Sequence, residues 1–171
     1  MIEIRAKQIV VAGQPRAGDG RGPTTSAPPG TSGSSASTWL QETGCGAVAS
    51  YLPWVFHELP DGTIDVTGTT RPERDVAAFI DLCHARGLWF IARPGPFVMA
   101  ELKSEGIPYR VYGEHPEVVP CGWDDTPTRS RTVDYLAPAL LAETAHWYDA
   151  IMAVVSTTTA ARRCCWHRAP R

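Results

Sequence analysis

The chain has 171 residues, of which 43% are hydrophobic and 20% charged, and this composition is typical of a globular protein with one ordinary domain. A net charge of -2 and a pI near 6.2 exclude a strong electrostatic preference for nucleic acid or for an anionic membrane. The sequence shows neither a signal-peptide core nor a bilayer-spanning run, and its five cysteines lack the spacing of a disulfide framework, so we expect a cytoplasmic protein.

Residues 1–38 fall into two parts of different character. Residues 1–13 contain the segment Ile2–Val11, which predicts a strand pair or a single lead-in strand. Residues 14–38 contain no Leu, Ile, Val, Met or aromatic residue and are dominated by Gly, Pro, Ser, Thr and Ala. Such a segment cannot bury enough apolar surface to offset the entropy of ordering, so we expect it to be disordered.

Two short apolar runs predict strands. Ala47–Leu52 and Leu88–Ala92 have the composition of strands that are buried on both faces of a parallel sheet. The second strand should end near Arg93, because the prolines at positions 94 and 96 cannot donate a ladder hydrogen bond.

A helix is predicted between these two strands. Thr70 and Glu73 have the spacing of a capping box, and apolar residues then repeat at helical spacing as far as Gly87. Strand, helix and strand in this order form a βαβ unit. A second helix is predicted over Thr132–Val155, with Pro138 either in its first turn or at a kink. Residues 156–171 lack this pattern and form an aberrant tail.

Four blocks of the sequence resemble the family 35 glycoside hydrolases, the β-galactosidase group, in order and in spacing. They are YLPWVFHE (51–58), DGTIDVTG (61–68), GLWFIARPGPFVMAEL (87–102) and EGIPY (105–109). The resemblance implies that residues 39–155 form the first units of a TIM (β/α)₈ barrel. The barrel would be incomplete, because a whole one needs at least about 200 residues.

The resemblance also implies a sugar-binding site. By this likeness Tyr51, Ala100 and Glu101 bind galactose hydroxyls, and no cofactor or metal is expected. Met99 stands where relatives commonly carry Asn or Cys, which removes one hydrogen bond to the sugar. Arg110 stands where close relatives usually carry a Trp, which removes one apolar wall of the pocket.

Further residues are candidates for the pocket, each with an alternative. Trp54 and Phe97 could offer apolar faces to a sugar ring or belong to the core. Arg93 could reach the pocket or neutralise a buried carboxylate, the second being favoured. Glu58 could be structural or lie at the pocket edge.

Read without the resemblance, Glu58 and Glu101 could act as acid and nucleophile if they were held about 5 Å apart. The resemblance argues against this, because it places the general acid/base in an Asn-Glu pair on the fourth strand and the nucleophile on the seventh. The chain contains no Asn. We therefore predict no catalytic residue in this chain. His57 is expected to be a hydrogen-bonded structural histidine.

The resemblance fades at both ends, which leads to a hypothesis about residues 14–38 and 156–171. Residues 14–38 have the composition that GC-rich DNA yields when it is translated out of frame, and we favour this reading over a flexible linker. A second frameshift near Ser156 is the simplest account of residues 156–171. We expect a fragment of a β-galactosidase that is inactive by itself. The alternative is a non-catalytic remnant that serves as a carbohydrate-binding or interaction module. Unpaired sheet edges predict self-association.

Overall fold

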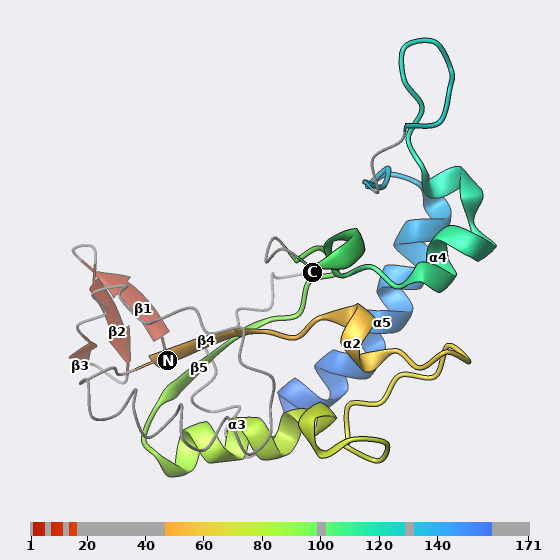
Figure 1. Cartoon of the computed structure of the whole chain (residues 1–171). Helices are drawn as coiled ribbons and strands as arrows, with labels where there is room; N and C mark the ends of the chain where they lie inside the picture. Colours follow the sequence, from red (N-terminus) through yellow and green to blue (C-terminus); the bar gives the residue numbers. More distant parts are fainter. Residues whose placement is uncertain are drawn as a thin grey trace.

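The fold was analysed in a computed structural model. The structure describes residues 47–98, 102–128 and 132–158, together with three short strands near the N-terminus (Figure 1). These strands, β1 (Ile2–Arg5), β2 (Gln8–Val11) and β3 (Gln14–Arg16), form an antiparallel sheet in the order β1-β2-β3. Of the two alternatives for Ile2–Val11, the strand pair is the one observed.

The start of the predicted disordered segment is wrong, because its first three residues pair as β3 with β2. Pro15 is compatible with this arrangement, since β3 is an edge strand and a proline there need not donate to a second neighbour. The rest of the 14–38 segment lies outside the described residues, as does the tail beyond residue 158.

The second sheet consists of two parallel strands. In β4 (Ala47–Tyr51) and β5 (Trp89–Arg93), Ala47 lies opposite Trp89 and Tyr51 lies opposite Arg93. Helix α3 (Val76–Ala85) connects them, so the predicted βαβ unit is confirmed, as is the end of β5 at Arg93. The fold is therefore of mixed α/β type, and the incomplete TIM barrel remains a prediction.

The predicted capping box at Thr70 is wrong. The Thr70 hydroxyl and backbone N–H both donate to the Asp65 carboxylate, and residues Pro72–Arg74 form a 3₁₀ turn, η1. Helix α3 begins at Val76, where the side chain of Asp75 accepts the Ala78 N–H at 2.8 Å. The chain thus makes the η1 turn first, and Asp75 rather than Thr70 reaches the N–H groups at the helix end.

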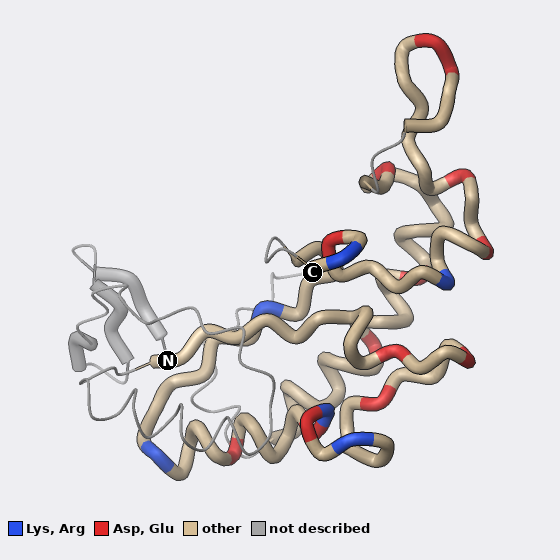
Figure 2. The backbone as a smooth tube through the Cα atoms, in the orientation of Figure 1, with Lys and Arg blue, Asp and Glu red and all other residues tan. Residues whose placement is uncertain are grey.

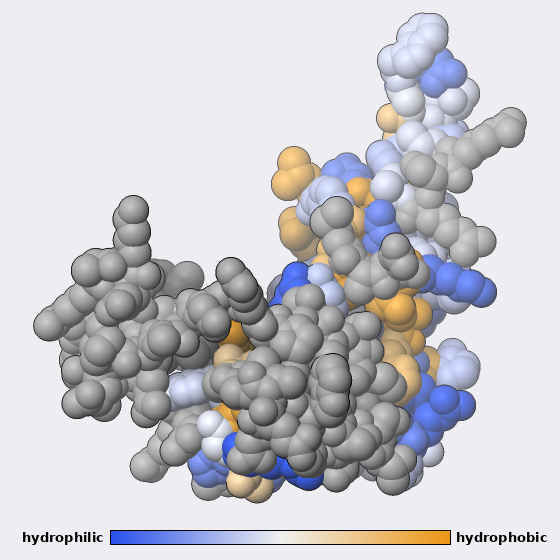
Figure 3. Space-filling view, turned by 60° about the vertical axis from the view of Figure 1, so that its left-hand side comes forward, coloured by the Kyte–Doolittle hydropathy of each residue, from blue (hydrophilic) through white to orange (hydrophobic). Residues whose placement is uncertain are grey.

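The remaining helices follow β5. They are the short α4 (Tyr109–Glu114), the 3₁₀ turns η2 (Lys103–Gly106) and η3 (Pro116–Val118), and the long α5 (Pro138–Thr157); α2 (Trp54–His57) follows β4. Pro138 occupies the first turn of α5, as one of the two sequence alternatives had it. The loop that follows η3 projects away from the molecule, carries Trp123 at 99% exposure, and is mostly hydrophilic (Figures 1 and 3).

The core lies between one face of the β4–β5 sheet and helices α3 and α5. Side chains of Val48, Phe90 and Ala92 are buried on this face, and the ring of Phe79 meets that of Phe90 edge-on at 5.5 Å. On the opposite face Ile91 is 37% exposed. Burial on both faces of this strand was thus predicted wrongly. An apolar run of this length cannot by itself distinguish a strand covered on one face from one covered on two.

Candidate functional site

The carboxyl edge of the parallel sheet brings two of the predicted residues together. Tyr51 ends β4, Arg93 ends β5, and the two are paired in register on the face opposite the buried one. The guanidinium carbon of Arg93 lies 3.8 Å from the centre of the Tyr51 ring, a cation–π contact. The structure therefore places Arg93 beside Tyr51 at the strand end, which is where parallel α/β proteins build their sites.

The loop that follows Arg93 is held from two sides. Helix α5 supplies two donors, Trp147 Nε1 to the Pro94 carbonyl at 2.7 Å and the Tyr148 hydroxyl to the Gly95 carbonyl. On the other side, the Val98 N–H donates to the Glu105 carbonyl at 2.7 Å. The loop also contains a cis peptide bond between Gly95 and Pro96. Backbone between Pro94 and Val98 is thus anchored to two other elements.

Three predicted residues continue directly from this anchored loop. Met99, Ala100 and Glu101 lie outside the described residues, so their predicted contacts with a sugar remain predictions. The two candidate aromatic residues are described, and they lie in different environments. Trp54 is fully buried and stacks on Trp147 with ring centres 6.2 Å apart, which places it in the core. Phe97 is half-buried and lies at the surface end of the loop.

Glu58 is part of a buried ion pair. Its side chain is only 3% exposed and accepts Trp54 Nε1 at 2.8 Å, Arg110 Nε at 3.0 Å and Arg110 Nη2 at 3.2 Å. Both oxygens are therefore occupied by donors from within the chain. This arrangement matches the structural alternative for Glu58 rather than a carboxylate that faces a sugar.

Arg110 joins Glu58 to two further carboxylates. Its Nη2 lies 2.6 Å from Glu143 of α5, and its Nη1 lies 2.7 Å from Glu114 of α4. Figure 2 shows acidic positions on α4 and on the neighbouring turns. The hydrogen bonds from Arg110, helped by one from His115, lower the pKa of Glu143 despite its partial burial. The hydrogen bonds that Arg110 donates to Glu143 and Glu58 raise the pKa of Arg110, so the guanidinium stays charged.

A pocket of about 460 Å³ lies beside this cluster. Its walls come from the 61–62 turn, α4 and α5; they are Asp61, Gly62, Arg110, Glu114, His115, Ala139, Ala142, Glu143 and His146. No local pattern in the sequence indicated this pocket, since Arg110 and Glu58 are 52 residues apart. The available signal was indirect: a carboxylate that follows a buried apolar run needs a cationic partner.

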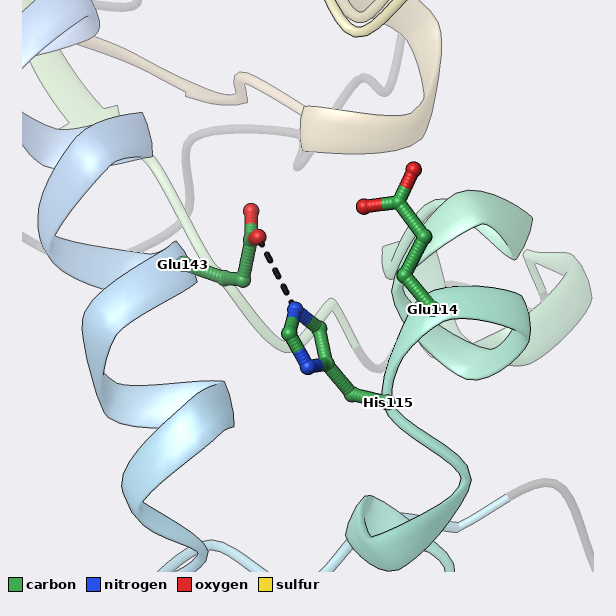
Figure 4. A group of neighbouring side chains, drawn as sticks. All are labelled: Glu114, His115 and Glu143. Atoms are coloured by element: carbon green, nitrogen blue, oxygen red, sulfur yellow. Dashed lines mark hydrogen bonds and ion pairs between the residues drawn. The ribbon is translucent and has the colours of Figure 1, made fainter.

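Among the described residues, Glu114, His115 and Glu143 are the one group of three or more potential metal-ligating side chains that lie close together. Their potential ligand atoms all lie within 4.8 Å of one another, and His115 Nε2 lies 3.2 Å from Glu143 (Figure 4). Arg110 already contacts both carboxylates, so a metal ion would have to compete with a guanidinium for the same oxygens. We therefore assign this group to charge neutralisation between α4 and α5.

His57 has a structural role. Its Nδ1 lies 2.8 Å from the Asp65 carbonyl, and the ring is buried between Phe56 and Trp147. Burial lowers the pKa of His57, and the hydrogen bond to Asp65 opposes this only in part. The predicted hydrogen-bonded structural histidine is confirmed.

A βαβ unit with a polar strand-end site is typical of α/β enzymes. Residues 35–161 match the family model of the glycosyl hydrolases family 35. The chain belongs to this family, and the resemblance seen in the sequence is confirmed.

The chain is also similar in sequence to several individual enzymes. The chain is 33% identical over 119 residues to an exo-β-D-glucosaminidase of Pyrococcus horikoshii, covering 68% of this chain and 15% of that protein. It is 31% identical over 118 residues to a β-1,2-glucosyltransferase of Ignavibacterium album, covering 68% and 16%. A β-galactosidase of Mus musculus is 41% identical over 69 residues, covering 40% and 10%. The chain thus spans only a small part of each relative's length. Among the described residues, no helix is long and apolar enough to cross a membrane.

Proposed function

We propose that this chain carries part of the sugar-binding pocket of a β-galactosidase-like glycoside hydrolase acting on terminal β-galactosides. The observation that supports this most directly is the pairing of Tyr51 and Arg93 at the carboxyl edge of the sheet, beside an anchored loop that leads into Ala100 and Glu101. Tyr51 and Glu101 bind the sugar hydroxyls, because a phenol and a carboxylate can both form hydrogen bonds with them. Membership of family 35 supports a sugar as the ligand.

We further propose that the chain binds a galactoside without cleaving it. Retaining hydrolysis needs one carboxylic acid to protonate the leaving oxygen and a second carboxylate to attack the anomeric carbon. Glu58 is engaged by Trp54 and Arg110, so it is not free to take either role. The catalytic carboxylates that the family resemblance implies come from later strands.

The binding proposal is tested by titrating methyl β-D-galactoside into the isotopically labelled chain. We expect chemical shift changes at Tyr51 and Glu101, and weaker binding after Tyr51→Phe and Glu101→Gln. Tyr109→Phe is a matched control, because Tyr109 is 51% exposed on α4. Unchanged shifts at both Tyr51 and Glu101 would contradict the assignment.

The proposal that the chain is inactive is tested with a chromogenic β-galactoside. The purified chain and its Glu101→Gln variant are assayed side by side, and neither should exceed the background rate. Turnover by the chain that disappears in the variant would overturn the proposal, because it would show that Glu101 takes part in the chemistry.

A second candidate function is a non-catalytic interaction module. It is favoured by the β4–β5 sheet, which has two strands in the described part of the chain and exposes Ile91 at 37% on one face. Open strand edges and apolar faces favour self-association. Light scattering coupled to size-exclusion chromatography tests this, and a monomer at all concentrations would contradict it. For both candidate functions we propose a cytoplasmic protein, because its five cysteines lack the spacing of a disulfide framework.

A further inference from the structure

Two adjacent residues near the strand-end site have strained backbone angles and buried polar atoms without a hydrogen-bond partner. Ser104 and Glu105 both have left-handed backbone angles, with φ of 51° and 54°, although neither is a glycine. Ser104 Oγ and Glu105 Oε2 are also buried polar atoms without a hydrogen-bond partner. Backbone strain and unpaired buried polar atoms both cost stability, and they persist where the surrounding structure enforces them, often at functional sites.

The surrounding structure places this pair against the loop that follows β5. The Glu105 carbonyl accepts the Val98 N–H at 2.7 Å. Gly106 packs so closely on the same residue that an added Cβ would lie 3.2 Å from the Val98 side chain. Glu105 is therefore fixed next to Phe97 and Val98, on the anchored loop that leads into residues 99–101.

An exposed aromatic ring, that of Tyr135, contacts this loop at Phe97. Tyr135 meets Phe97 edge-on, with ring centres 5.5 Å apart and an interplanar angle of 74°. Phe97 is half-buried and Tyr135 is 55% exposed, so the pair presents aromatic surface to solvent. Burial, and then the negative charge of Glu105, raise the pKa of Tyr135.

We propose that Phe97, Tyr135 and Glu105 form an additional saccharide contact, which we call the Glu105 corner, beside the strand-end site. Sugars combine an apolar C–H face with hydrogen-bond donors. Tyr135 offers a ring for the C–H face, and the unpaired carboxylate oxygen of Glu105 accepts a hydrogen bond from a hydroxyl or an ammonium group. This oxygen is buried in the structure, so the proposal requires the half-buried Glu105 side chain to rotate when the sugar binds. The inference rests on the proposed sugar-binding function.

The test measures sugar binding by the full chain and its variants. Two probes, methyl β-D-galactoside and D-glucosamine, distinguish a hydroxyl from an ammonium donor. Glu105→Gln and Tyr135→Ala should each weaken binding by about tenfold, as expected for the loss of a hydrogen bond to a charged acceptor or of an aromatic contact. If the donor is ammonium, Glu105→Gln should weaken glucosamine binding more than galactoside binding, and added salt should weaken the glucosamine complex.

Matched controls make the result specific. Glu73→Gln changes another half-buried glutamate, on η1, and Tyr109→Ala changes a tyrosine of similar exposure, 51% against 55%. Neither control should alter binding. Glu105→Gln keeps the shape of the side chain, and its thermal unfolding and amide spectrum establish that the fold is retained.

The outcomes separate this inference from the proposed function. Full-strength binding by both Glu105→Gln and Tyr135→Ala, together with loss of binding in Tyr51→Phe, overturns the Glu105 corner and leaves the strand-end site intact. Weaker binding by Glu105→Gln and Tyr135→Ala, with unchanged binding by Glu73→Gln and Tyr109→Ala, supports the corner. A native chain that binds neither sugar overturns both proposals.

Discussion

Replacing Arg110 with methionine should strongly destabilise the fold, because Arg110 is the cation that neutralises Glu58. The Glu58 side chain is 3% exposed, so water cannot replace the lost partner, and only the Trp54 hydrogen bond would remain. Removing one partner of a buried ion pair costs about 3–5 kcal/mol. Glu143, with 18% side-chain exposure, adds a smaller cost, and the exposed Glu114 adds at most about 0.5 kcal/mol.

The expected loss is a large share of the total stability of a domain, which is about 5–15 kcal/mol. Urea unfolding followed by tryptophan fluorescence measures it. The double variant Arg110→Met/Glu58→Gln should recover much of the loss, because it also removes the uncompensated charge. Arg71→Met, at an exposed position, is the control and should stay within about 0.5 kcal/mol of the native chain.

Two results would refute this reasoning. One is a loss below about 1 kcal/mol in Arg110→Met, which is the range of a surface ion pair. The other is a double variant that is no more stable than Arg110→Met, which would show that the charge on Glu58 is not the cause.

Three further predictions concern other parts of the fold. Glu105→Gly should stabilise the chain by about 1 kcal/mol, since glycine adopts a positive φ freely and the unpaired carboxylate oxygen disappears; thermal unfolding that shows a loss instead would contradict the strain. Burial lowers the pKa of His57, so the unfolded chain binds the extra proton more readily; stability should be complete above about pH 6.5 and decline as the pH falls toward the folded pKa. His57→Gln should flatten that part of the pH profile, and an unchanged profile would exclude His57 as its cause. Burial raises the pKa of Cys83 to about 11, so at pH 8 an alkylating reagent should modify the exposed Cys121 and spare Cys83 until the chain unfolds, as peptide mass spectrometry would show.

The strands could be predicted because their limits are encoded locally. Prolines at positions 94 and 96 cannot extend a ladder, and β5 ends at Arg93 as expected. The start of α3 could not be placed in the same way. Thr70 and Glu73 have the spacing of a cap, but Asp65 accepts the Thr70 hydroxyl, and Asp75 caps the helix instead. The Thr70 hydroxyl donates to Asp65, whereas the cap at Asp75 accepts the Ala78 N–H, and the path of the chain decides which side chain reaches the helix end.

The charge cluster was beyond local patterns for a different reason. Arg110 contacts Glu114 four residues away, which is a visible helical spacing, but its contacts with Glu58 and Glu143 span 52 and 33 residues. In the sequence Arg110 is conspicuous only as a replacement for the Trp that close relatives usually carry. Its actual role follows from burial, because a carboxylate inside the protein is tolerated only with a partner.

The two stacked indoles of Trp54 and Trp147 connect this cluster to the strand-end site. Trp54 donates to the Glu58 carboxylate, Trp147 donates to the Pro94 carbonyl, and their rings are nearly parallel at 12° with both side chains fully buried. Close-packed interiors transmit displacements, because neighbouring side chains leave no empty space to absorb them. The position of the loop that leads to Glu101 is therefore determined by the core and by α5 rather than by the loop's own residues. This explains why Trp54, although it follows β4, belongs to the core and not to the surface of the candidate strand-end site.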